Sequence, residues 1–205
     1  MTDTKLNGIT AVLVRLLFHP KVLYAHPEDK ESAMKEPSLL VCNHTSHLDG
    51  PFVNTALRPH CIHSLAAKDR FEQRGFGFFL RHTGCIPIDR EHPDMSWIKE
   101  SVSVLTSSRE HVSIYPEGRH GKHRQPLPFH SGAALLAAIA RVPVVIVYID
   151  GPVRPFRRNR MIVSAPFYLP TPAEGITTSF ITDQTHLLEN KMQQLIQQME
   201  TLYAE

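Results

Sequence analysis

The sequence predicts an α/β fold: a single domain with a mixed, mostly parallel sheet flanked by helices. Short apolar runs alternate along the chain with segments long enough to form helices, which is the pattern of α/β proteins. The chain has 205 residues, of which 42% are hydrophobic, and this is enough to bury one full core. Because no internal repeat or low-complexity linker divides the chain, we expect one domain over residues 1–205.

Six apolar runs are the expected strands. Each is short and is bounded by turn residues or by charged residues, as is typical of strands that are buried in a sheet. The runs are Leu39–Cys42, Cys61–Ala67, Cys85–Ile88, Val112–Tyr115, Val142–Ile149 and Met161–Ser164.

Three segments have the apolar spacing or the alanine and leucine content of helices: 94–108, 132–140 and about 181–203. The last is the clearest, and we expect its apolar face to pack in the core. A further helix is expected to begin after Asn43. There Ser46 and Asp49 fit a capping box, and Pro51 is tolerated in a first turn.

A candidate catalytic pair follows the first apolar run, where His44 precedes Asp49 by five residues. Ligands of open α/β sheets bind at the carboxyl ends of strands, which is where His44 is expected. Asp49 could reach back to one ring nitrogen of His44 and leave the other free to accept a proton. The spacing also arises by chance, as with His26 and Glu31, so the plain alternative is a helix cap beside a surface histidine.

A second polar turn follows another expected strand, where the run Val112–Ile114 leads into Tyr115–Arg119. Gly118 would let the backbone approach a ligand closely, and Arg119 could pair with a phosphate. Glu117 could hold that arginine or a substrate hydroxyl. Pro-Glu-Gly turns are also common without any function, so this turn alone does not decide between the two readings.

Two further charged positions lie at the ends of expected strands. Lys68 follows one strand, and Asp89 and Arg90 follow another, although these last two could simply pair with each other. The chain contains no Gly-x-Ser-x-Gly elbow and no Walker-type phosphate loop. A covalent serine mechanism and nucleotide hydrolysis therefore lack their usual sequence support.

Taken in order, these segments resemble the four sequence blocks of the glycerolipid acyltransferase family, and most nearly its lysophosphatidic acid acyltransferase group. The resemblance covers about residues 37–170. Four blocks in the right order are far more specific than any one of them. The blocks are Asn43-His44-x-x-x-x-Asp49; Lys68 with Gly77, Gly84 and Ile88-Asp89-Arg90; Tyr115-Pro116-Glu117-Gly118; and Phe129-x-x-Gly132-Ala133 with Val142-Pro143-Val144-Val145.

The resemblance implies transfer of an acyl group from acyl-CoA or an acyl carrier protein to a hydroxyl of a lysophosphatidate-type acceptor in phospholipid synthesis. It implies no cofactor beyond this co-substrate. By this likeness His44 is the general base and Asp49 is its partner. The substrate-binding residues that it implies are Asn43, Ser46, Lys68, Arg90, Glu117, Gly118 and Arg119.

The residue chemistry agrees with this role. Neutral His44 would take the proton of the acceptor hydroxyl as the oxygen attacks the thioester, and the imidazolium, stabilised by Asp49, would protonate the leaving thiolate. Backbone amides at the start of the following helix, or a nearby cation, would stabilise the oxyanion. His47 is the competing candidate base, but it lacks the five-residue spacing from an acid.

The chain departs from the family pattern in the third block, which usually reads Glu-Gly-Thr-Arg. Here Arg119 directly follows Gly118, so Lys122 or Arg124 could bind the acceptor phosphate instead, and His130 stands where a lysine is common. The alternatives are the same chemistry on glycerol 3-phosphate, a lyso-aminolipid or a glycolipid. A non-catalytic lipid- or metal-binding protein is the alternative suggested by the 13 histidines.

The three cysteines, Cys42, Cys61 and Cys85, form no paired disulfide framework, and no cleavable signal peptide precedes them. A reducing, cytoplasmic compartment is therefore expected. The pair Cys61 and His63, next to His60, could bind a metal ion. Because no second pair with zinc-like spacing follows, we interpret these residues as alternating positions of a strand and expect no metal site.

No apolar segment is long enough to cross a bilayer as a helix. The run Ile9–Phe18 could lie in a membrane interface or pack on the domain, and Phe76–Leu80 could line an acyl groove, touch lipid or pack in the core. Basic clusters at 119–124 and 154–160 suit a phosphate-bearing partner or an anionic membrane, although a solvated loop is equally compatible. We expect peripheral association with the cytoplasmic membrane and no nucleic-acid partner.

Overall fold

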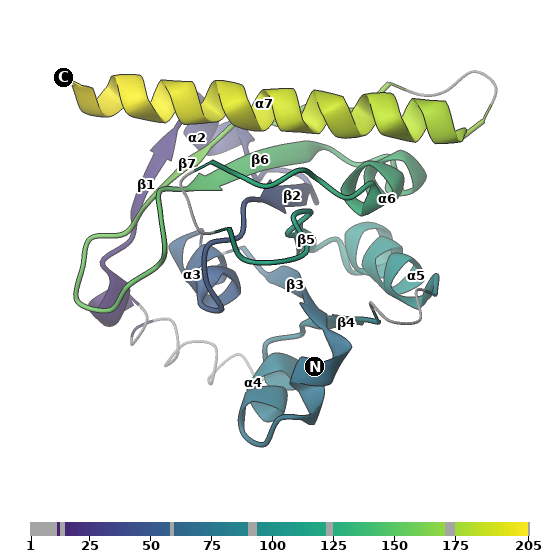
Figure 1. Cartoon of the computed structure of the whole chain (residues 1–205), viewed down its shortest axis with the longest axis horizontal. Helices are drawn as coiled ribbons and strands as arrows, with labels where there is room; N and C mark the ends of the chain where they lie inside the picture. The colour runs from purple at the N-terminus through teal and green to yellow at the C-terminus, as the bar shows by residue number, and fades with distance from the viewer. Residues whose placement is uncertain are drawn as a thin grey trace.

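The structure is a computed structural model that describes residues 12, 15–57, 60–89, 94–121, 125–170 and 175–204. Its centre is a seven-stranded sheet in the order β1-β7-β6-β2-β5-β3-β4 (Figure 1). The strands are β1 (Lys21–Tyr24), β2 (Leu39–Cys42), β3 (Ile62–Ala67), β4 (Ile86–Ile88), β5 (His111–Ile114), β6 (Val144–Ile149) and β7 (Arg160–Val163).

Strands β2 to β6 all run parallel to one another, whereas β7 pairs antiparallel with β6 and β1 pairs parallel with β7. This is the mixed, mostly parallel sheet that the sequence predicts. In the register, Leu39 of β2 lies between Val112 of β5 and Val144 of β6. The carboxyl ends of β2 and β5 therefore meet at one edge, and the polar segments that follow them come together there.

Helices cover both faces of this sheet (Figure 1). Helices α5, α6 and α7 pack on one face, and α3 with the segment after α2 packs on the other. The helical elements are α2 (Asp29–Ser32), α3 (Asp49–Ala56), the 3₁₀ turn η1 (Lys68–Glu72), α4 (Phe76–His82), α5 (Ser96–Ser103), the π-helical turn η2 (Val104–Ser108), α6 (Gly132–Ala140) and α7 (Thr178–Ala204).

The continuous apolar runs of the central strands follow from this arrangement, since β2 and β6 are buried along their whole lengths. Leu39 and Val41 pack in the core beneath α5, α6 and α7, while Leu40 and Cys42 pack in the core beside α3. A strand covered on both faces has no solvent side to alternate with, so its sequence reads as an unbroken apolar run.

The six expected strands are confirmed, each within two residues of its expected bounds. The sequence did not reveal β1 (Lys21–Tyr24), because this edge strand has only four residues and is half-buried. The capping box is wrong in detail. Helix α3 begins at Asp49 with Leu48 before it, and no side chain caps its first amides.

Half of the apolar run Ile9–Phe18 lies outside the described residues. At its end, Phe18 is buried in the core beside α3, whereas Leu16 is exposed. Within the part of the chain that the structure describes, no helix combines the length and the apolar character needed to cross a membrane.

Helix α7 should contribute directly to stability, because its Leu188 is 0% exposed whereas Leu202 is 48% exposed. We expect Leu188→Ala to lower the free energy of unfolding by about 2–5 kcal/mol, the cost of a core cavity. The matched variant Leu202→Ala should lower it by no more than about 0.5 kcal/mol. Urea unfolding followed by circular dichroism measures both, and equal small losses would contradict the packing of α7 in the core.

Candidate active site

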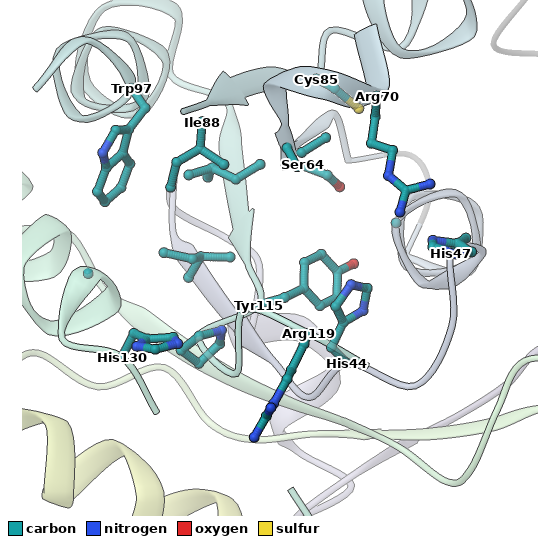
Figure 2. A pocket seen from close by; sticks show the side chains of 18 of the residues that line it. His44, His47, Ser64, Arg70, Cys85, Ile88, Trp97, Tyr115, Arg119 and His130 are labelled. Carbon is teal, nitrogen blue, oxygen red and sulfur yellow. The ribbon is translucent and has the colours of Figure 1, made fainter. Parts of the chain in front are cut away.

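A cavity of about 600 Å³ opens where β2, β3 and β5 end (Figure 2). One end of it is polar and contains His44, His47 and Arg70, whereas Trp97 and Ile88 stand at the other end. The remaining wall is mostly small or apolar, and this combination of an apolar lining with a few polar groups is typical of ligand sites. Further lining residues include Leu65, Ala66, Phe76, Leu80, Ile114, Tyr115, Gly118, Arg119, His120 and Ala133.

His44 and Asp49 form a hydrogen-bonded pair at the polar end of this cavity. The Nδ1 atom of His44 lies 2.8 Å from Oδ2 of Asp49, whose side chain is 0% exposed. An ionised carboxylate only accepts hydrogen bonds, so the ring carries its proton on Nδ1. The lone pair is then on Nε2, on the far side of the ring, as a general base requires.

The buried Asp49 carboxylate is held by four further donors from the loop before it. The backbone amides of Thr45 and Ser46 donate to Oδ2 over 2.6 and 2.8 Å. The hydroxyls of the same two residues donate to Oδ1 over 2.8 and 2.9 Å. These bonds compensate the burial of the charge. Because both amides are taken by Asp49, they are not free to bind a substrate oxyanion. The expected role of amides at the start of the following helix, which begins at Asp49, stays a prediction.

The backbone of His44 is held from the neighbouring turn. Its amide donates to Oε1 of Glu117 over 2.7 Å, and its carbonyl accepts from the amide of Gly121 over 2.8 Å. The other Glu117 oxygen accepts from the amide of Leu127 over 2.8 Å. Glu117 is buried, does not line the cavity, and its pKa is raised by that burial. Its carboxylate therefore ties three loop segments together.

Asn43 is buried as well, and it connects β2 to β6. Its amide nitrogen donates to the carbonyl of Ile149 over 3.0 Å, and its oxygen accepts from the Ile149 amide over 2.7 Å. These two bonds extend the hydrogen-bond ladder between β2 and β6, with the Asn43 side chain in place of a strand backbone. Neither Asn43 nor Ser46 lines the cavity, so a contact of either with substrate stays a prediction.

The turn after β5 places three residues around His44. Gly118 has φ +66°, and a Cβ atom there would lie 3.0 Å from the ring of His130, so glycine is required. Arg119 is exposed and lines the cavity. The ring of His120 packs edge-on against that of His44, with centroids 4.1 Å apart. Burial, with the nearby His44, lowers the pKa of His120 to about 4, so this ring is neutral at pH 7.

The remaining expected substrate-binding residues lie elsewhere. Lys68 is exposed, forms an ion pair with Asp89 over 3.1 Å and does not line the cavity. Arg90, Lys122 and Arg124 lie outside the described residues. The expected pairing of Asp89 with Arg90 therefore stays a prediction.

The structure adds one residue that the sequence did not single out, Arg70, and shows how Tyr115 and His47 lie near it or near His44. Arg70, in η1, is half-buried at the polar end of the cavity, near His47 (Figure 2). Tyr115 packs its ring 4.7 Å from that of His44. His47, the competing base, is exposed and packs on His120, while the carboxylate of Asp49 bonds the ring of His44. Arg70 had only one signal, a basic residue shortly after an expected strand.

Comparison with known proteins supplies the family. The sequence profile of the Acyltransferase family matches residues 22–150, which contain the pair His44 and Asp49 and the turn Tyr115–Arg119. The chain belongs to the Acyltransferase family. The family expected from the sequence blocks is therefore confirmed.

Two bacterial relatives of this acyltransferase are each named 1-acyl-sn-glycerol-3-phosphate acyltransferase. The protein of Streptococcus pneumoniae is 34% identical over 127 residues, which cover 62% of this chain and 47% of that protein. The protein of Bacillus subtilis is 28% identical over 169 residues, which cover 77% of this chain and 83% of that protein. The match thus spans about half of the first relative and most of the second.

A solved structure shares the fold. The crystal structure of the 1-acyl-sn-glycerophosphate (LPA) acyltransferase PlsC from Thermotoga maritima superposes with a TM-score of 0.61. The two sequences are 15% identical, and the match covers 95% of this chain and 83% of that chain. This likeness confirms the predicted α/β fold of the acyltransferase.

The role of Asp49 can be tested by the isosteric change Asp49→Asn. An amide cannot accept all the donors that surround Asp49 and no longer favours the Nδ1–H form of His44. The equivalent change in serine hydrolases lowers kcat by about 10⁴, and we expect a loss of that order in acyl transfer. Ser46→Ala removes one donor to the oxygen that does not contact His44 and should lower kcat by less than about 10-fold. Similar losses in both variants would contradict the assignment.

Glu117 should act by positioning the loop that carries His44. In Glu117→Gln the side-chain amide group faces one of two backbone donors, which leaves that donor unpaired. We expect the free energy of unfolding to fall by about 1–3 kcal/mol and kcat to fall with it. The control Glu100→Gln, on the exposed face of α5, should change stability by no more than about 0.5 kcal/mol. A raised KM for the acceptor at unchanged stability would instead mean that Glu117 contacts substrate.

Proposed function

We propose that this acyltransferase moves a fatty acyl group from an acyl thioester, acyl-CoA or acyl carrier protein, to the hydroxyl of a lysophosphatidate-type acceptor in phospholipid synthesis. The observation that carries the proposal is the pair His44 and Asp49, 2.8 Å apart at the polar end of a cavity with an apolar far wall. The names of the bacterial relatives support the same acceptor class.

In the proposed reaction, Nε2 of His44 takes the proton of the acceptor hydroxyl while its oxygen attacks the thioester carbonyl. The tetrahedral intermediate collapses by breaking the carbon–sulfur bond, and the imidazolium returns its proton to the leaving thiolate. Asp49 stabilises the imidazolium and keeps the ring oriented through both steps. Since the amides of Thr45 and Ser46 are bonded to Asp49, oxyanion stabilisation falls to a nearby cation or to the amides at the start of α3, where Gly50 lines the cavity.

The apolar end of the cavity suits the acyl chain. Trp97 of α5 and Ile88 at the end of β4 contribute large apolar surfaces to it, and Phe76 of α4 lines the same cavity. Burying each methylene there stabilises the bound acyl group by about 0.8 kcal/mol. Within the segment Phe76–Leu80, Phe76 and Leu80 line the cavity, which supports a role in binding the acyl chain, whereas Phe78 is exposed.

The polar end suits an anionic head group, because Arg70 and Arg119 both line it. A second candidate has its own support. His120 stands where the family's third block usually carries arginine, and its lowered pKa keeps it uncharged. This substitution favours an acceptor with less charge than a phosphate, such as a lyso-aminolipid or a glycolipid. Glycerol 3-phosphate is a third acceptor that the same site could take.

We also infer association with the surface of the cytoplasmic membrane. Phe156 is 80% exposed at the tip of the β6–β7 loop, between the exposed residues Arg154 and Arg157. Its amide bonds the carbonyl of Leu17, next to the exposed Leu16. Exposed apolar side chains flanked by cations are typical of proteins that bind anionic bilayers from one side.

A matrix of donors and acceptors tests the proposed reaction. Thiol release would be measured with acyl-CoA and with acyl carrier protein, each against lysophosphatidate, glycerol 3-phosphate, a lyso-aminolipid and a glycolipid acceptor. We expect release with lysophosphatidate and its loss in His44→Ala. Activity that persists in His44→Ala would overturn the mechanism. If the folded protein releases no thiol with any pair of donor and acceptor, a non-catalytic lipid-binding role is favoured instead.

The variant Arg119→Ala distinguishes an acceptor that carries a phosphate from an uncharged acceptor. A charge-assisted hydrogen bond contributes about 1.5–3 kcal/mol, so Arg119→Ala should raise KM for lysophosphatidate by roughly 10- to 150-fold. KM for monoacylglycerol, which lacks the phosphate, should change little. Lys99→Ala removes an exposed cation on α5, outside the cavity lining, and serves as the charge-matched control. Equal effects on both acceptors would assign the phosphate to other residues.

A further inference from the structure

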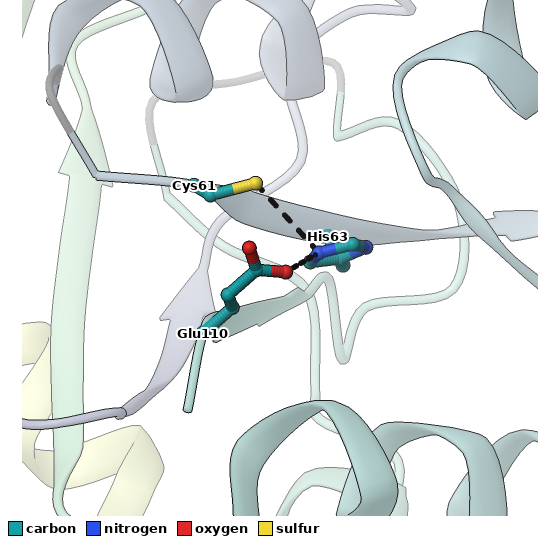
Figure 3. A group of neighbouring side chains, drawn as sticks. All are labelled: Cys61, His63 and Glu110. Carbon is teal, nitrogen blue, oxygen red and sulfur yellow. Dashed lines mark hydrogen bonds and ion pairs between the residues drawn. The ribbon is translucent and has the colours of Figure 1, made fainter. Parts of the chain in front are cut away.

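A compact cluster of a thiol, an imidazole and a carboxylate lies at the start of β3 and β5, away from the acyl-transfer cavity (Figure 3). The Sγ atom of Cys61 lies 3.7 Å from Nε2 of His63, and Oε2 of Glu110 lies 2.6 Å from the same nitrogen. One ligand atom from each residue falls within 4.8 Å of the other two. All three side chains are partly exposed, so solutes can reach them.

The sheet itself builds this cluster. Cys61 and His63 are two residues apart across the start of β3, so their side chains project to the same face. The register pairs Ile62 with His111, which puts Glu110 beside Cys61, and the amide of His111 donates to the carbonyl of Cys61 over 3.0 Å. The ligand atoms are thus carried by paired strands rather than by a mobile loop. They lie at the amino ends of these strands, whereas the cavity lies at the carboxyl ends.

The ring of His63 is oriented as a metal ligand requires. Its Nδ1 atom lies 2.7 Å from the carbonyl oxygen of Gly84, which only accepts a hydrogen bond, so Nδ1 carries a proton. A backbone carbonyl on the second nitrogen is the usual partner of a metal-bound histidine. Nε2 is therefore the atom that faces Cys61 and Glu110.

We propose that Cys61, His63 and Glu110 bind a divalent cation that accepts thiolate and imidazole ligands, with Zn²⁺ as the best match. In a tetrahedral zinc site, bonds of about 2.3 Å to sulfur and about 2.0 Å to nitrogen put these two atoms about 3.6 Å apart. The pair Cys61 and His63 already has this separation. Glu110, 37% exposed, needs to move away from Nε2 by less than about 1 Å to reach the same geometry.

The charge of the surroundings agrees with a bound cation. A Cys61 thiolate and a Glu110 carboxylate would each supply a negative charge to the cation. Three protein ligands leave a fourth position for water.

The site would act on the structure of the cavity from a distance. The carbonyl bonded by His63 belongs to Gly84, in the turn that joins α4 to β4. Leu80 of α4 and Cys85 and Ile88 on the far side of that turn line the cavity. A metal ion at Cys61, His63 and Glu110 would hold β3, β5 and this turn together, and so would stabilise one wall of the cavity. We therefore assign it a structural role.

Zinc binding by the full chain tests the proposal. After incubation with Zn²⁺ and dialysis, elemental analysis should find one equivalent in the wild type. Co²⁺ in its place should produce a thiolate-to-metal charge-transfer absorption. Cys61→Ser should abolish that absorption, and Glu110→Gln, a milder change at a partly exposed side chain, should weaken binding by at least about 10-fold. Zn²⁺ should raise the unfolding temperature of the wild type more than that of Glu110→Gln.

Matched variants give the controls, since Cys85→Ser removes another thiol and Glu100→Gln another carboxylate. Both should retain one equivalent of Zn²⁺ and the cobalt absorption. The proposal is overturned if the wild type retains no zinc, if bound Co²⁺ lacks the thiolate absorption, or if Cys61→Ser and Glu110→Gln bind as tightly as the wild type. Any of these results would leave His63 and Glu110 as a plain ion pair.

Discussion

The burial of one negative charge organises the site of this acyltransferase. Asp49 is 0% exposed, and a carboxylate in such surroundings is tolerated only when donors surround it. The loop before α3 folds around it, so that Thr45 and Ser46 contribute both their amides and their hydroxyls. His44, the remaining donor, takes its orientation from the same carboxylate. The position of His44, the proposed base, is thus a consequence of the hydrogen bonds that the buried Asp49 carboxylate requires.

The parallel sheet then places this loop among its neighbours. Strand β2 lies between β5 and β6. Side chains in the segments that follow these three strands can therefore reach the backbone of a neighbouring segment. Asn43 uses this proximity to bond Ile149, and Glu117 uses it to bond the amide of His44. Asn43 and Glu117, two polar residues of the sequence blocks, therefore form hydrogen bonds with backbone groups. Both residues hold the loop that carries the proposed base, and neither lines the cavity.

The sequence predicted well what is local and poorly what depends on strand order. The pair His44 and Asp49 lies within one short segment, so its spacing is visible in the sequence. The central strands are apolar because both faces are covered, so the sequence predicts them as well. The bond from His44 to Glu117 joins residues 73 apart in the chain, and only the sheet reveals it. Arg70 stands in a short 3₁₀ turn with no periodic pattern. Likewise, Cys61 and His63 lacked a third ligand until the register brought Glu110 beside them.

The bonds of Thr45 and Ser46 to Asp49 also bear on how this site could change over evolution. Their amides are already engaged, so in the proposed reaction neither can stabilise the developing oxyanion, and Arg70 and Arg119 share one cavity with that oxyanion and the acceptor head group. Acceptor preference and the rate of the chemical step then depend on the same side chains. A lineage that exchanges one head group for another would alter its turnover at the same time. Compensating changes are to be expected around Arg70 and Arg119 in relatives with different lipids.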